Sequence, residues 1–332
     1  MKKKMILCVI LIVVCATVCC FALTACNQND ASLRFAAPEG TPALAMLRLV
    51  VDNKTIEGKN MNYEVVSPGN IAVEMSSEKA DIVIMPINAG ANLIRQGANY
   101  KLVSVAVDGS LFMVGKKDEA GEITFDDIKG KKIACIGQNA VPGMVFRYVM
   151  KQNGINIITE GTPDAENNEV FVKYVADGTA AKALMQATDS TKVDFAVVGE
   201  PAATAFRTPL SLNAEMNMQI KYAQASGNET YPQAGLFVKN SLASNTAFMD
   251  ALFAALQASK DWVTANASEV TAYAKANLYD ATFPPSSISR CAINVQKLTD
   301  AKKAEIVSFL TIIMPKDSQG NDINWLNVTN LF

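Results

Sequence analysis

The stretch CIGQNAVPG, at Cys135–Gly143, has the layout of a phosphate-binding loop. An apolar run stops at Gly137, and a helix-like stretch begins near Pro142. A loop at this position can hold an anion or a polar group, because the first N–H groups of a helix are unpaired and its dipole is positive there. A P-loop also needs Gly-Lys-Ser/Thr, and a dinucleotide fingerprint needs two further glycines. Neither pattern follows Gly137, so we predict a site of backbone donors rather than a nucleotide site.

The absence of histidine narrows the chemistry further. It excludes Ser-His-Asp and Cys-His pairs, and zinc sites that contain histidine. After residue 26 only Cys135 and Cys291 remain, without a Cys-x-x-Cys motif, and a single bridge between them stays open. The stretch DSQGND at 317–322 lacks the alternating ligands and the closing glutamate of a calcium loop. We therefore expect no catalytic residue, no metal and no cofactor.

The first 25 residues predict a secretory leader. Lysines at 2–4 precede an apolar run that extends to Leu23, and the run ends in Leu-Thr-Ala-Cys at 23–26. Basic residues, an apolar core and small residues before the cleavage site define a signal peptide. The tetrapeptide resembles a bacterial lipobox, which implies that Cys26 becomes the lipidated first residue. A plain signal peptide or an uncleaved anchor are the alternatives. We expect a signal peptide at 1–25 and a polar tether at 26–32.

Charge and length limit the class of protein. Without the three leader lysines, the chain has 27 basic and 32 acidic residues, a net charge of −5. A mildly acidic exported chain is a poor match for nucleic acid. About 300 mature residues exceed the size at which a single core keeps growing, so two lobes are expected.

Strand-like and helix-like stretches alternate after the tether. Strands are expected at 33–38, 62–67, 81–86, 101–108, 131–137, 170–175 and 194–199, with helices at 42–52, 71–79, 89–96, 142–153, 179–187 and 201–207. Runs rich in valine and isoleucine that alternate with helices predict parallel sheets covered on both faces. The expected fold class is α/β.

The alternation also repeats. DIVIMPINAGANL at 81–93 matches DFAVVGEPAATAF at 194–206 in register, and TPALAMLRLV at 41–50 is similar to VPGMVFRYVM at 141–150. The matched order of elements favours two similar lobes. In open α/β sheets, ligands bind beyond the carboxyl ends of the strands. Four loops are therefore expected in the cleft, at 37–41, 85–88, 137–141 and 199–201.

Several stretches together resemble the substrate-binding lipoproteins of ABC importers. Within that class they are similar to the nitrate/sulfonate/taurine group, which shares its fold with proteins that bind thiamine-precursor pyrimidines. The stretches are the lipobox, FAAPEGTPALAMLRL, DIVIMPINAGANLIRQG, KKIACIGQNAVPGMVFRYVM, DFAVVGEPAATA and YPQAGLFVKN. The likeness extends from Leu33 to about Ala265.

The resemblance implies a two-lobe, periplasmic-binding-protein-like fold of type II, the Venus flytrap. Two strands would cross between the lobes, at 103–114 and 231–238. The first lobe would then contain 33–108 and 232–332, and the second lobe 109–231. In the helix-rich tail, apolar residues at helical spacing are expected to pack on the first lobe, namely Leu242, Phe248, Leu252, Leu256 and Val263.

The function that the resemblance implies is solute capture outside the cell. The protein would be an exported, lipid-anchored, monomeric and non-enzymatic component of an ABC transporter. Its partners would be a small-molecule ligand, an ABC permease with its ATPase, and the membrane through the lipid on Cys26. A ligand that contacts both lobes binds the closed state better than the open one, and so closes the cleft.

The expected ligand-binding residues lie in the cleft loops and the crossing strands. They are Gly40, Thr41, Pro42, Asn88, Ala89, Ser110, Gln138, Asn139, Ala140, Val141, Glu200, Tyr231 and Gln233. The residues at helix starts could instead be caps, and the last two could instead stabilise the hinge. Glu200 could accept from a ligand amine or cap the following helix. Because Arg48 and Arg147 lie inside helices, the arginine clamp of a sulfonate binder is not evident. We expect a small polar or heteroaromatic ligand, neutral or zwitterionic.

Two other classes of protein share the same pattern. One is an enzyme on this fold, of the pyrimidine-precursor or menaquinone-pathway type. The pyrimidine-precursor enzyme would require histidine and a cysteine-rich metal motif, and the chain has neither. The other is a lipoprotein sensor that signals through a partner instead of supplying a permease.

Overall fold

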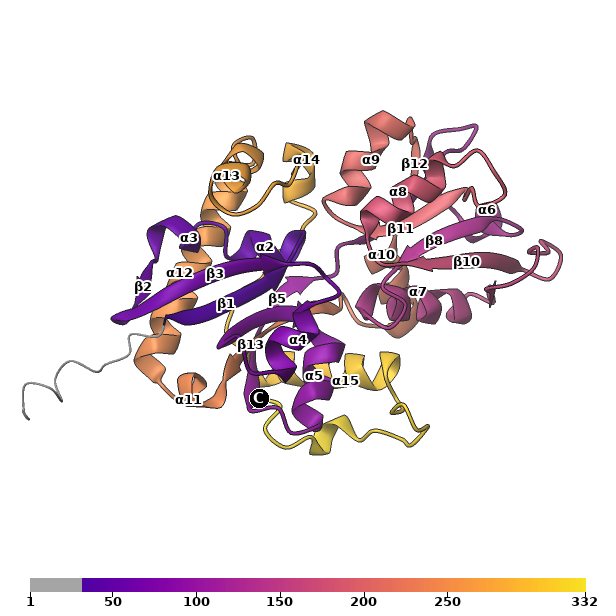
Figure 1. The fold of residues 1–332 in the computed structure, drawn as a ribbon. Helices are drawn as coiled ribbons and strands as arrows, with labels where there is room; N and C mark the ends of the chain where they lie inside the picture. Colours follow the sequence, from indigo (N-terminus) through magenta and orange to yellow (C-terminus); the bar gives the residue numbers. More distant parts are fainter. Residues whose placement is uncertain (1–31) are drawn as a thin grey trace, which may run out of the picture. The chain divides into compact units, whose positions relative to one another are not determined.

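The described part of the chain is residues 32–332 of a computed structural model. The predicted signal peptide, the lipidation residue Cys26 and the tether up to residue 31 lie outside the described residues. Leu33–Phe332 form one compact unit that contains two β-sheets with helices around them (Figure 1).

The first sheet has six strands in the order β2-β3-β1-β4-β13-β5. Strands β1, β3 and β4 are parallel, whereas β13 is antiparallel to both β4 and β5. Their bounds are β1 Leu33–Pro38, β2 Thr55–Ile56, β3 Lys59–Val66, β4 Ile82–Pro86, β5 Tyr100–Asp108 and β13 Pro232–Lys239. We call this sheet and the helices packed on it the first lobe.

The second sheet has seven strands in the order β7-β12-β6-β11-β8-β10-β9. Strands β8, β9, β10 and β11 are parallel, and β6 is antiparallel to both β11 and β12. The bounds are β6 Leu111–Gly115, β7 Gly121–Glu122, β8 Lys132–Ile136, β9 Asn156–Ile158, β10 Glu169–Val175, β11 Phe195–Gly199 and β12 Ala214–Asn217. This sheet and its helices are the second lobe.

The two sheets repeat one strand order, which confirms the internal repeat predicted from the sequence. Read from one edge, β3-β1-β4-β13-β5 in the first sheet corresponds to β10-β8-β11-β6-β12 in the second. In each sheet the fourth of these strands is the antiparallel one that has crossed from the other lobe. The α/β fold class is likewise confirmed.

Both faces of each sheet are covered, as the apolar strand runs predict. The helices of the first lobe are α2 Thr41–Ala45, α3 Leu49–Asp52, α4 Ile71–Ser76, α5 Ile87–Arg95, α11 Asn240–Ala243, α12 Thr246–Ala265 and α13 Val270–Asn277. Phe35 packs towards α12, and its neighbour Ala36 towards α4 and α5. Successive side chains of a strand point to opposite faces, so both must be apolar in a sheet buried on both sides.

The second lobe is built in the same way. Its helices are α6 Phe125–Ile128, α7 Val141–Gln152, α8 Gly178–Gln186, α9 Ala202–Leu210 and α10 Met218–Ser226. Cys135 belongs to the apolar cluster that includes Val145 of α7, whereas Ala134 belongs to the cluster that includes Phe206 of α9. The chain then ends with α14 Pro285–Ile288, α15 Asp300–Ile313 and a short 3₁₀ helix at Trp325–Asn327.

The prediction of a single helix at 42–52 is wrong in one respect. The segment forms two short helices, α2 and α3, separated by a turn at 46–48. In the turn the Arg48 N–H donates to Ser259 Oγ of α12, at 3.1 Å, and Leu49 N donates to Met46 O three residues back. A side chain from 211 residues further along the chain therefore takes a donor that a continuous helix would use internally.

The crossing between the lobes contains a glycine in a tight space. Strand β5 ends at Asp108 and β6 starts at Leu111, so Gly109 and Ser110 form the break in the crossing strand. A Cβ atom added at Gly109 would come within 2.7 Å of the Tyr231 ring. Contacts this short do not occur between carbon atoms, so the close approach of the two crossing segments requires glycine at this position.

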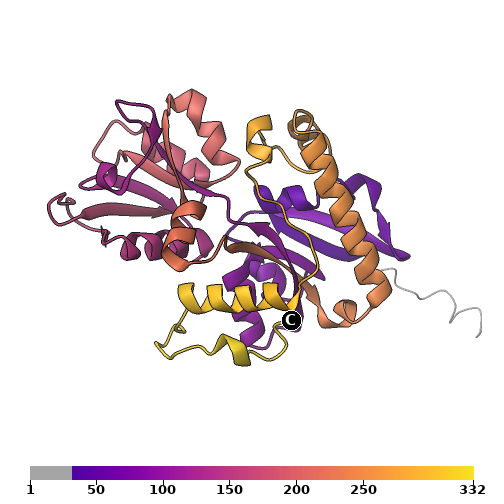
Figure 2. The ribbon, with the colours of Figure 1, turned by 180° about the vertical axis from the view of Figure 1, so that it is seen from behind.

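The helical tail contacts both lobes. The predicted apolar stripe from Leu242 to Val263 packs on the first lobe as expected. Helix α15 lies against α7 of the second lobe, and its residues Ile306, Phe309 and Leu310 share one apolar cluster with strands of both sheets. Figure 2 shows α15 as the long yellow helix below the crossing strands.

Candidate functional site

The four loops at the carboxyl ends of the strands meet in two pairs. In the first pair, the loop after β1 contacts the loop after β11. The Thr41 hydroxyl donates to the backbone oxygen of Glu200 at 2.8 Å, and both residues are buried. Thr41 begins α2, and its hydroxyl is used across the lobes rather than as a cap for its own helix. The predicted residues Thr41 and Glu200 are therefore brought together.

In the second pair, the loop after β4 contacts the loop after β8. The Asn88 side-chain nitrogen donates to the Asn139 backbone oxygen at 3.1 Å, and it lies 3.4 Å from Met144 Sδ. Asn88 is the second residue of α5 and is almost fully buried. The two pairs follow the repeat, since each joins a loop of one lobe to a loop of the other.

The predicted cleft loop at 137–141 is a tight turn at the start of α7. The Gly137 carbonyl accepts from Ala140 N at 2.9 Å and from Gly143 N at 3.2 Å. Gly143 has a clear role, because a Cβ atom there would lie 2.5 Å from the Gly137 oxygen. Arg147 reaches back from the helix and donates to the Gln138 oxygen at 2.6 Å. The loop is thus held by its own backbone, with Gln138 and Asn139 at its tip.

An arginine that sequence reasoning missed lies between the lobes. Arg290 follows α14, and its Nε donates to Glu200 Oε1 at 2.5 Å. Its terminal nitrogens donate to both oxygens of Glu215 on β12, at 3.2 and 2.8 Å. The guanidinium also lies 3.9 Å from the ring centre of Phe112 on β6, a cation–π distance. We call Arg290, Glu200, Glu215 and Phe112 the Arg290 cluster.

Both carboxylate oxygens of Glu200 accept hydrogen bonds. The Glu200 side chain is fully buried, and besides Arg290 its carboxylate accepts from the backbone N–H and the hydroxyl of Thr204 in α9. The capping interpretation of this residue is thus present in the structure, together with an ion pair. A buried carboxylate needs such partners, because burial without them is strongly unfavourable.

The charges of the cluster compensate one another. Burial alone would raise the pKa of Glu215, but hydrogen bonds and attraction from Arg290 and Arg207 outweigh it and hold that pKa below its ordinary value. Burial opposes the charged form of Arg290 as well, yet Glu215 and Glu200 together raise its pKa. Together with Arg207, which pairs with Glu215, the two arginines and two glutamates carry no net formal charge.

Ser110 and Gln233 meet at the crossing strands. The Ser110 N–H donates to Gln233 Oε1 at 3.2 Å, and the Ser110 carbonyl accepts from Glu200 N at 3.0 Å. The backbone of Ser110 is thus fixed on both sides. Its hydroxyl, by contrast, is fully buried and has no hydrogen-bond partner, and the same holds for Asn88 Oδ1.

The second crossing segment packs in an aromatic cluster. Tyr231 is fully buried, stacks on Phe309 of α15 with ring centres 5.7 Å apart, and meets Tyr222 of α10 edge-on at 5.1 Å. Its hydroxyl lies 3.2 Å from Gln219 Oε1. We call Tyr222, Tyr231 and Phe309 the aromatic cluster. The ring of Tyr231 contacts other aromatic rings of the protein, as expected of a residue that stabilises the hinge.

The remaining predicted residues line the starts of three helices. The Gly40 N–H donates to the Tyr279 hydroxyl at 2.9 Å, and Pro42 is the second residue of α2. Ala89 is in the first turn of α5, Ala140 is the residue before α7, and Val141 is its first residue and is buried. All five residues therefore lie at a helix start.

The sequence carries little signal for Arg290. It stands after the short helix α14, outside the repeat, and 90 residues from Glu200. The scarcity of arginines inferred for the cleft applies to the four loops but not to the tail. Only the return of the tail across the lobes places a guanidinium there.

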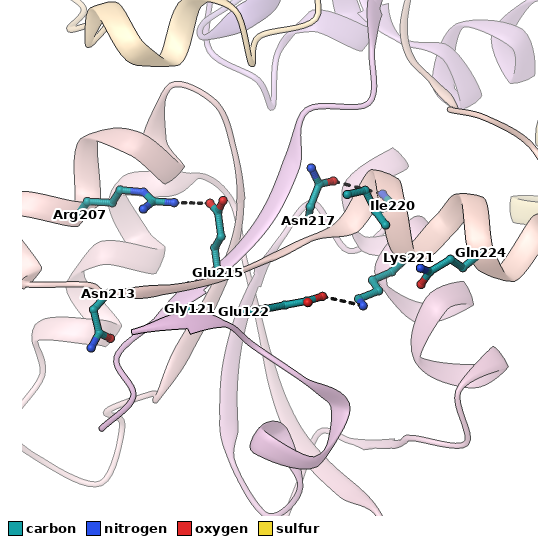
Figure 3. A pocket seen from close by; sticks show the side chains of 9 residues that line it. All are labelled: Gly121, Glu122, Arg207, Asn213, Glu215, Asn217, Ile220, Lys221 and Gln224. Carbon is teal, nitrogen blue, oxygen red and sulfur yellow. Dashed lines mark hydrogen bonds and ion pairs between the residues drawn. The ribbon is translucent and has the colours of Figure 1, made fainter. Parts of the chain in front are cut away.

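Two cavities lie away from the predicted residues. One of about 480 Å³ is lined by residues of the second lobe, among them Glu122, Arg207, Glu215 and Lys221 (Figure 3). Arg207 pairs with Glu215 at its wall, and Lys221 pairs with Glu122 at 2.8 Å. The other, of about 300 Å³, lies beside Arg147 and Asn156. The larger cavity adjoins the Arg290 cluster through Glu215.

Three further findings concern chemistry and membranes. Cys135 and Cys291 are both free and buried. Within residues 32–332 no group of three or more acidic, cysteine or histidine side chains is placed to hold a metal ion. In the same part of the chain, no helix combines the length and the apolar character needed to cross a bilayer.

Comparisons with known proteins give structural neighbours only. No protein-family profile matches the sequence, and no curated protein matches it. An ABC transporter structure from Parabacteroides distasonis has a TM-score of 0.67 and 19% identity, covering 90% of this chain and 95% of that one. The fold therefore agrees across almost the whole of both chains.

Two further structures share the fold. The periplasmic aliphatic sulphonate-binding protein SsuA from Escherichia coli has a TM-score of 0.58 and 14% identity, over 82% of this chain and 83% of that one. A ligand-binding component of an ABC-type import system from Staphylococcus aureus, with zinc bound, has a TM-score of 0.58 and 10% identity, over 90% and 99%. The fold implied by the resemblance is confirmed: this chain has the two-lobe α/β fold of the substrate-binding proteins of ABC importers.

Proposed function

We propose that the protein is an extracytoplasmic solute-binding lipoprotein of an ABC transporter. It captures a small polar or heteroaromatic molecule between its two lobes and delivers it to the permease and ATPase. Lobe boundaries at 108/109 and 231/232 fit this proposal, because the chain passes between the two sheets at these points. The protein acts as a monomer, without catalysis, cofactor or nucleic acid, and is held at the outer face of the membrane by the lipid on Cys26.

One observation carries the proposal: the four strand-end loops meet crosswise between the lobes. Thr41 reaches Glu200, and Asn88 reaches Asn139, so each lobe contributes one loop to each pair. Loops at the carboxyl ends of parallel strands are where α/β sheets bind ligands. A ligand held by both pairs would contact both lobes at once, and this is the condition for ligand-driven closure.

The ligand-binding role of the thirteen predicted residues is part of the proposal. In support, Asn88 contacts Asn139 in one loop pair, Gln138 precedes Asn139, and Ser110 contacts Glu200 of the other pair. Tyr231 and Glu200 are exceptions in detail. The Tyr231 ring packs on Tyr222 and Phe309, and the Glu200 carboxylate is engaged by Arg290 and Thr204. We assign the Glu200 carboxylate to closure of the lobes, and its backbone oxygen to the contact with Thr41.

A ligand screen tests the proposal. Purified protein is heated with vitamins, pyrimidines, sulfonates and amino acids, and unfolding is followed by dye fluorescence. A ligand at 100 times its dissociation constant should add about 2.7 kcal/mol to the free energy of unfolding. Mass spectrometry of small molecules released from the purified protein gives an independent identification. Folded protein that no compound stabilises, and that releases none, would contradict the proposal.

Export and anchoring need their own test. The chain is expressed in a bacterial host with Cys26 intact or changed to Ser. The proposal predicts that the intact chain partitions into the detergent phase of a Triton X-114 extract, and that Cys26→Ser partitions into the aqueous phase. Equal partition of the two chains would remove the lipid from the proposal without affecting the solute-binding role.

A further inference from the structure

Three buried polar atoms in the cleft loops and at the crossing have no partner, namely Asn88 Oδ1, Ser110 Oγ and Asp108 Oδ1. Asn88 and Ser110 have exposed fractions of 2% and 0%. A buried polar atom without a hydrogen bond costs about 1–3 kcal/mol. Most proteins avoid this cost, so such atoms at a contact between lobes point to a ligand that pairs with them.

The contact between Asn88 and Asn139 decides which side-chain atom of Asn88 is unpaired. Asn88 Nδ2 faces the Asn139 carbonyl, and a carbonyl only accepts. The amide nitrogen must therefore lie on that side, and the unpaired atom is the amide oxygen. It can be satisfied only by a donor, that is, by an N–H or O–H group.

The second atom lies in the crossing segment, which is linked to the Asn88 loop through strand β13. The Ser110 N–H donates to the Gln233 side chain. The next residue, Ala234 of β13, pairs with Pro86 at the end of β4. Asn88 follows Pro86 by two residues. Through its carbonyl, Ser110 also contacts Glu200, whose own backbone oxygen accepts from Thr41. The free hydroxyl can donate or accept.

The charges of Glu200 and Glu215 are already paired. Glu200 and Glu215 are neutralised by Arg290 and Arg207, and these four residues carry no net charge. An anionic ligand would find no free cation in this cluster, and its oxygens would meet the oxygen of Asn88. A sulfonate offers acceptors only, which is the wrong complement for an amide oxygen.

We propose that Asn88 Oδ1 and Ser110 Oγ form a subsite for the donor edge of an uncharged ligand. The ligand places an N–H or O–H on Asn88 and a neighbouring donor or acceptor on Ser110, as an amide or an amino-substituted heterocycle does. This inference rests on the proposed solute-binding function and narrows its ligand class.

The test uses pairs of probes that differ in charge. Nicotinamide is compared with nicotinate, cytosine with orotate, and propionamide with ethanesulfonate, by thermal shift and calorimetric titration of the full chain. We expect an uncharged member to stabilise the protein and its acidic counterpart not to. Stabilisation by an acid or a sulfonate overturns the donor subsite but leaves solute binding standing. No stabilisation by any probe counts against both.

Ser110→Ala separates the subsite from a structural role. The variant removes only an unpaired hydroxyl, so the melting temperature without probe should not fall, whereas affinity for the stabilising uncharged probe should drop about 10-fold. Ser104→Ala is the matched control, since Ser104 is also fully buried but donates to the Gln296 oxygen at 2.7 Å. That control should melt earlier and bind the probe as the wild type does. Unchanged affinity in Ser110→Ala overturns the subsite.

Discussion

Besides the two loop pairs, two clusters of opposite character lie between the lobes. The Arg290 cluster is polar: one guanidinium joins two carboxylates and an aromatic face. The aromatic cluster is apolar: Tyr222, Tyr231 and Phe309 pack without charge around the crossing segment. Both depend on the C-terminal tail, which supplies Arg290 to one and Phe309 to the other.

The difference indicates a division of roles. Apolar packing is non-directional and keeps most of its strength through small movements, so the aromatic cluster can act as a pivot. An ion pair with short hydrogen bonds depends on distance and geometry, so the Arg290 cluster distinguishes closed from open lobes. We expect changes in the aromatic cluster to affect stability most, and changes in the Arg290 cluster to affect closure and ligand affinity most.

The largest effect is expected from Phe309→Ala. Phe309 is 1% exposed, and its loss leaves a cavity between α15 and the crossing segment, which should lower the free energy of unfolding by about 3–5 kcal/mol. Chemical denaturation measures the loss. Hydrogen exchange should also rise in 228–234.

Phe248→Ala is the control for Phe309. Phe248 is equally buried but packs only within the first lobe. It should cost similar stability without raising exchange in 228–234. If both variants raise exchange there equally, the aromatic cluster is not a pivot.

Arg290→Ala is expected to act on closure. Removing one partner of a buried ion pair typically costs about 3–5 kcal/mol, because the remaining charge is left uncompensated. Here the fully buried Glu200 would be left with its Thr204 contacts, and opening the lobes would let water reach it. The variant should therefore populate open lobes, with a larger radius of gyration in X-ray scattering and weaker ligand binding.

Arg48→Ala provides the comparison for Arg290. Its side chain is 26% exposed against 28%, it also lies on aromatic rings, and it pairs with Asp52 within the first lobe. The radius of gyration should stay at the wild-type value. A wild-type radius for Arg290→Ala as well would refute the role of the Arg290 cluster in closure.

Gly109→Ala should have a smaller effect on the pivot. The added methyl group would meet the Tyr231 ring at 2.7 Å, and overpacking of this kind costs about 1–3 kcal/mol. Thermal unfolding measures the loss. Gly69→Ala is the control, because nothing lies within 4 Å of its added atom. Equal melting of the two variants would show that the crossing is not tightly packed.

The smallest effect is a pH dependence of the Arg290 cluster. The pKa of Glu215 is lowered in the folded state by Arg290 and Arg207, despite its burial. The stabilisation is therefore complete above the unfolded pKa and is lost as the pH falls through the lowered folded value. The stability difference between wild type and Glu215→Gln should be largest near about pH 7 and shrink towards about pH 3.

Asp127 gives the contrast for the pH experiment. Lys117 and Thr124, within the second lobe, outweigh burial and lower the pKa of Asp127 to about 2. Asp127→Asn should also be less stable than the wild type at neutral pH, and this difference in the free energy of unfolding should disappear in acid. Its ligand affinity at neutral pH should match the wild type. Only Glu215→Gln should weaken ligand binding. If both variants bind equally well, the pairing of Glu215 has no part in closure.

The sequence by itself determined the alternation of strands and helices and the internal repeat. Strand β1 covers 33–38, as predicted, and the break in the first crossing strand falls at Gly109 and Ser110. These features depend on local patterns, namely apolar runs, small residues and Pro at helix starts, and the same patterns specify where parallel strands end. The positions of the four loops follow from them.

Only the tertiary structure decided which side chains meet between the lobes. Ser259 breaks the helix at 42–52 from 211 residues away, and Arg290 reaches Glu200 across 90 residues. Tyr231 packs on Phe309 because the tail returns to the crossing strands. Such contacts leave no periodic signal, since they join segments whose own patterns are satisfied without them. The loops could be predicted because they are local, and their partners could not because the partners are distant in the chain.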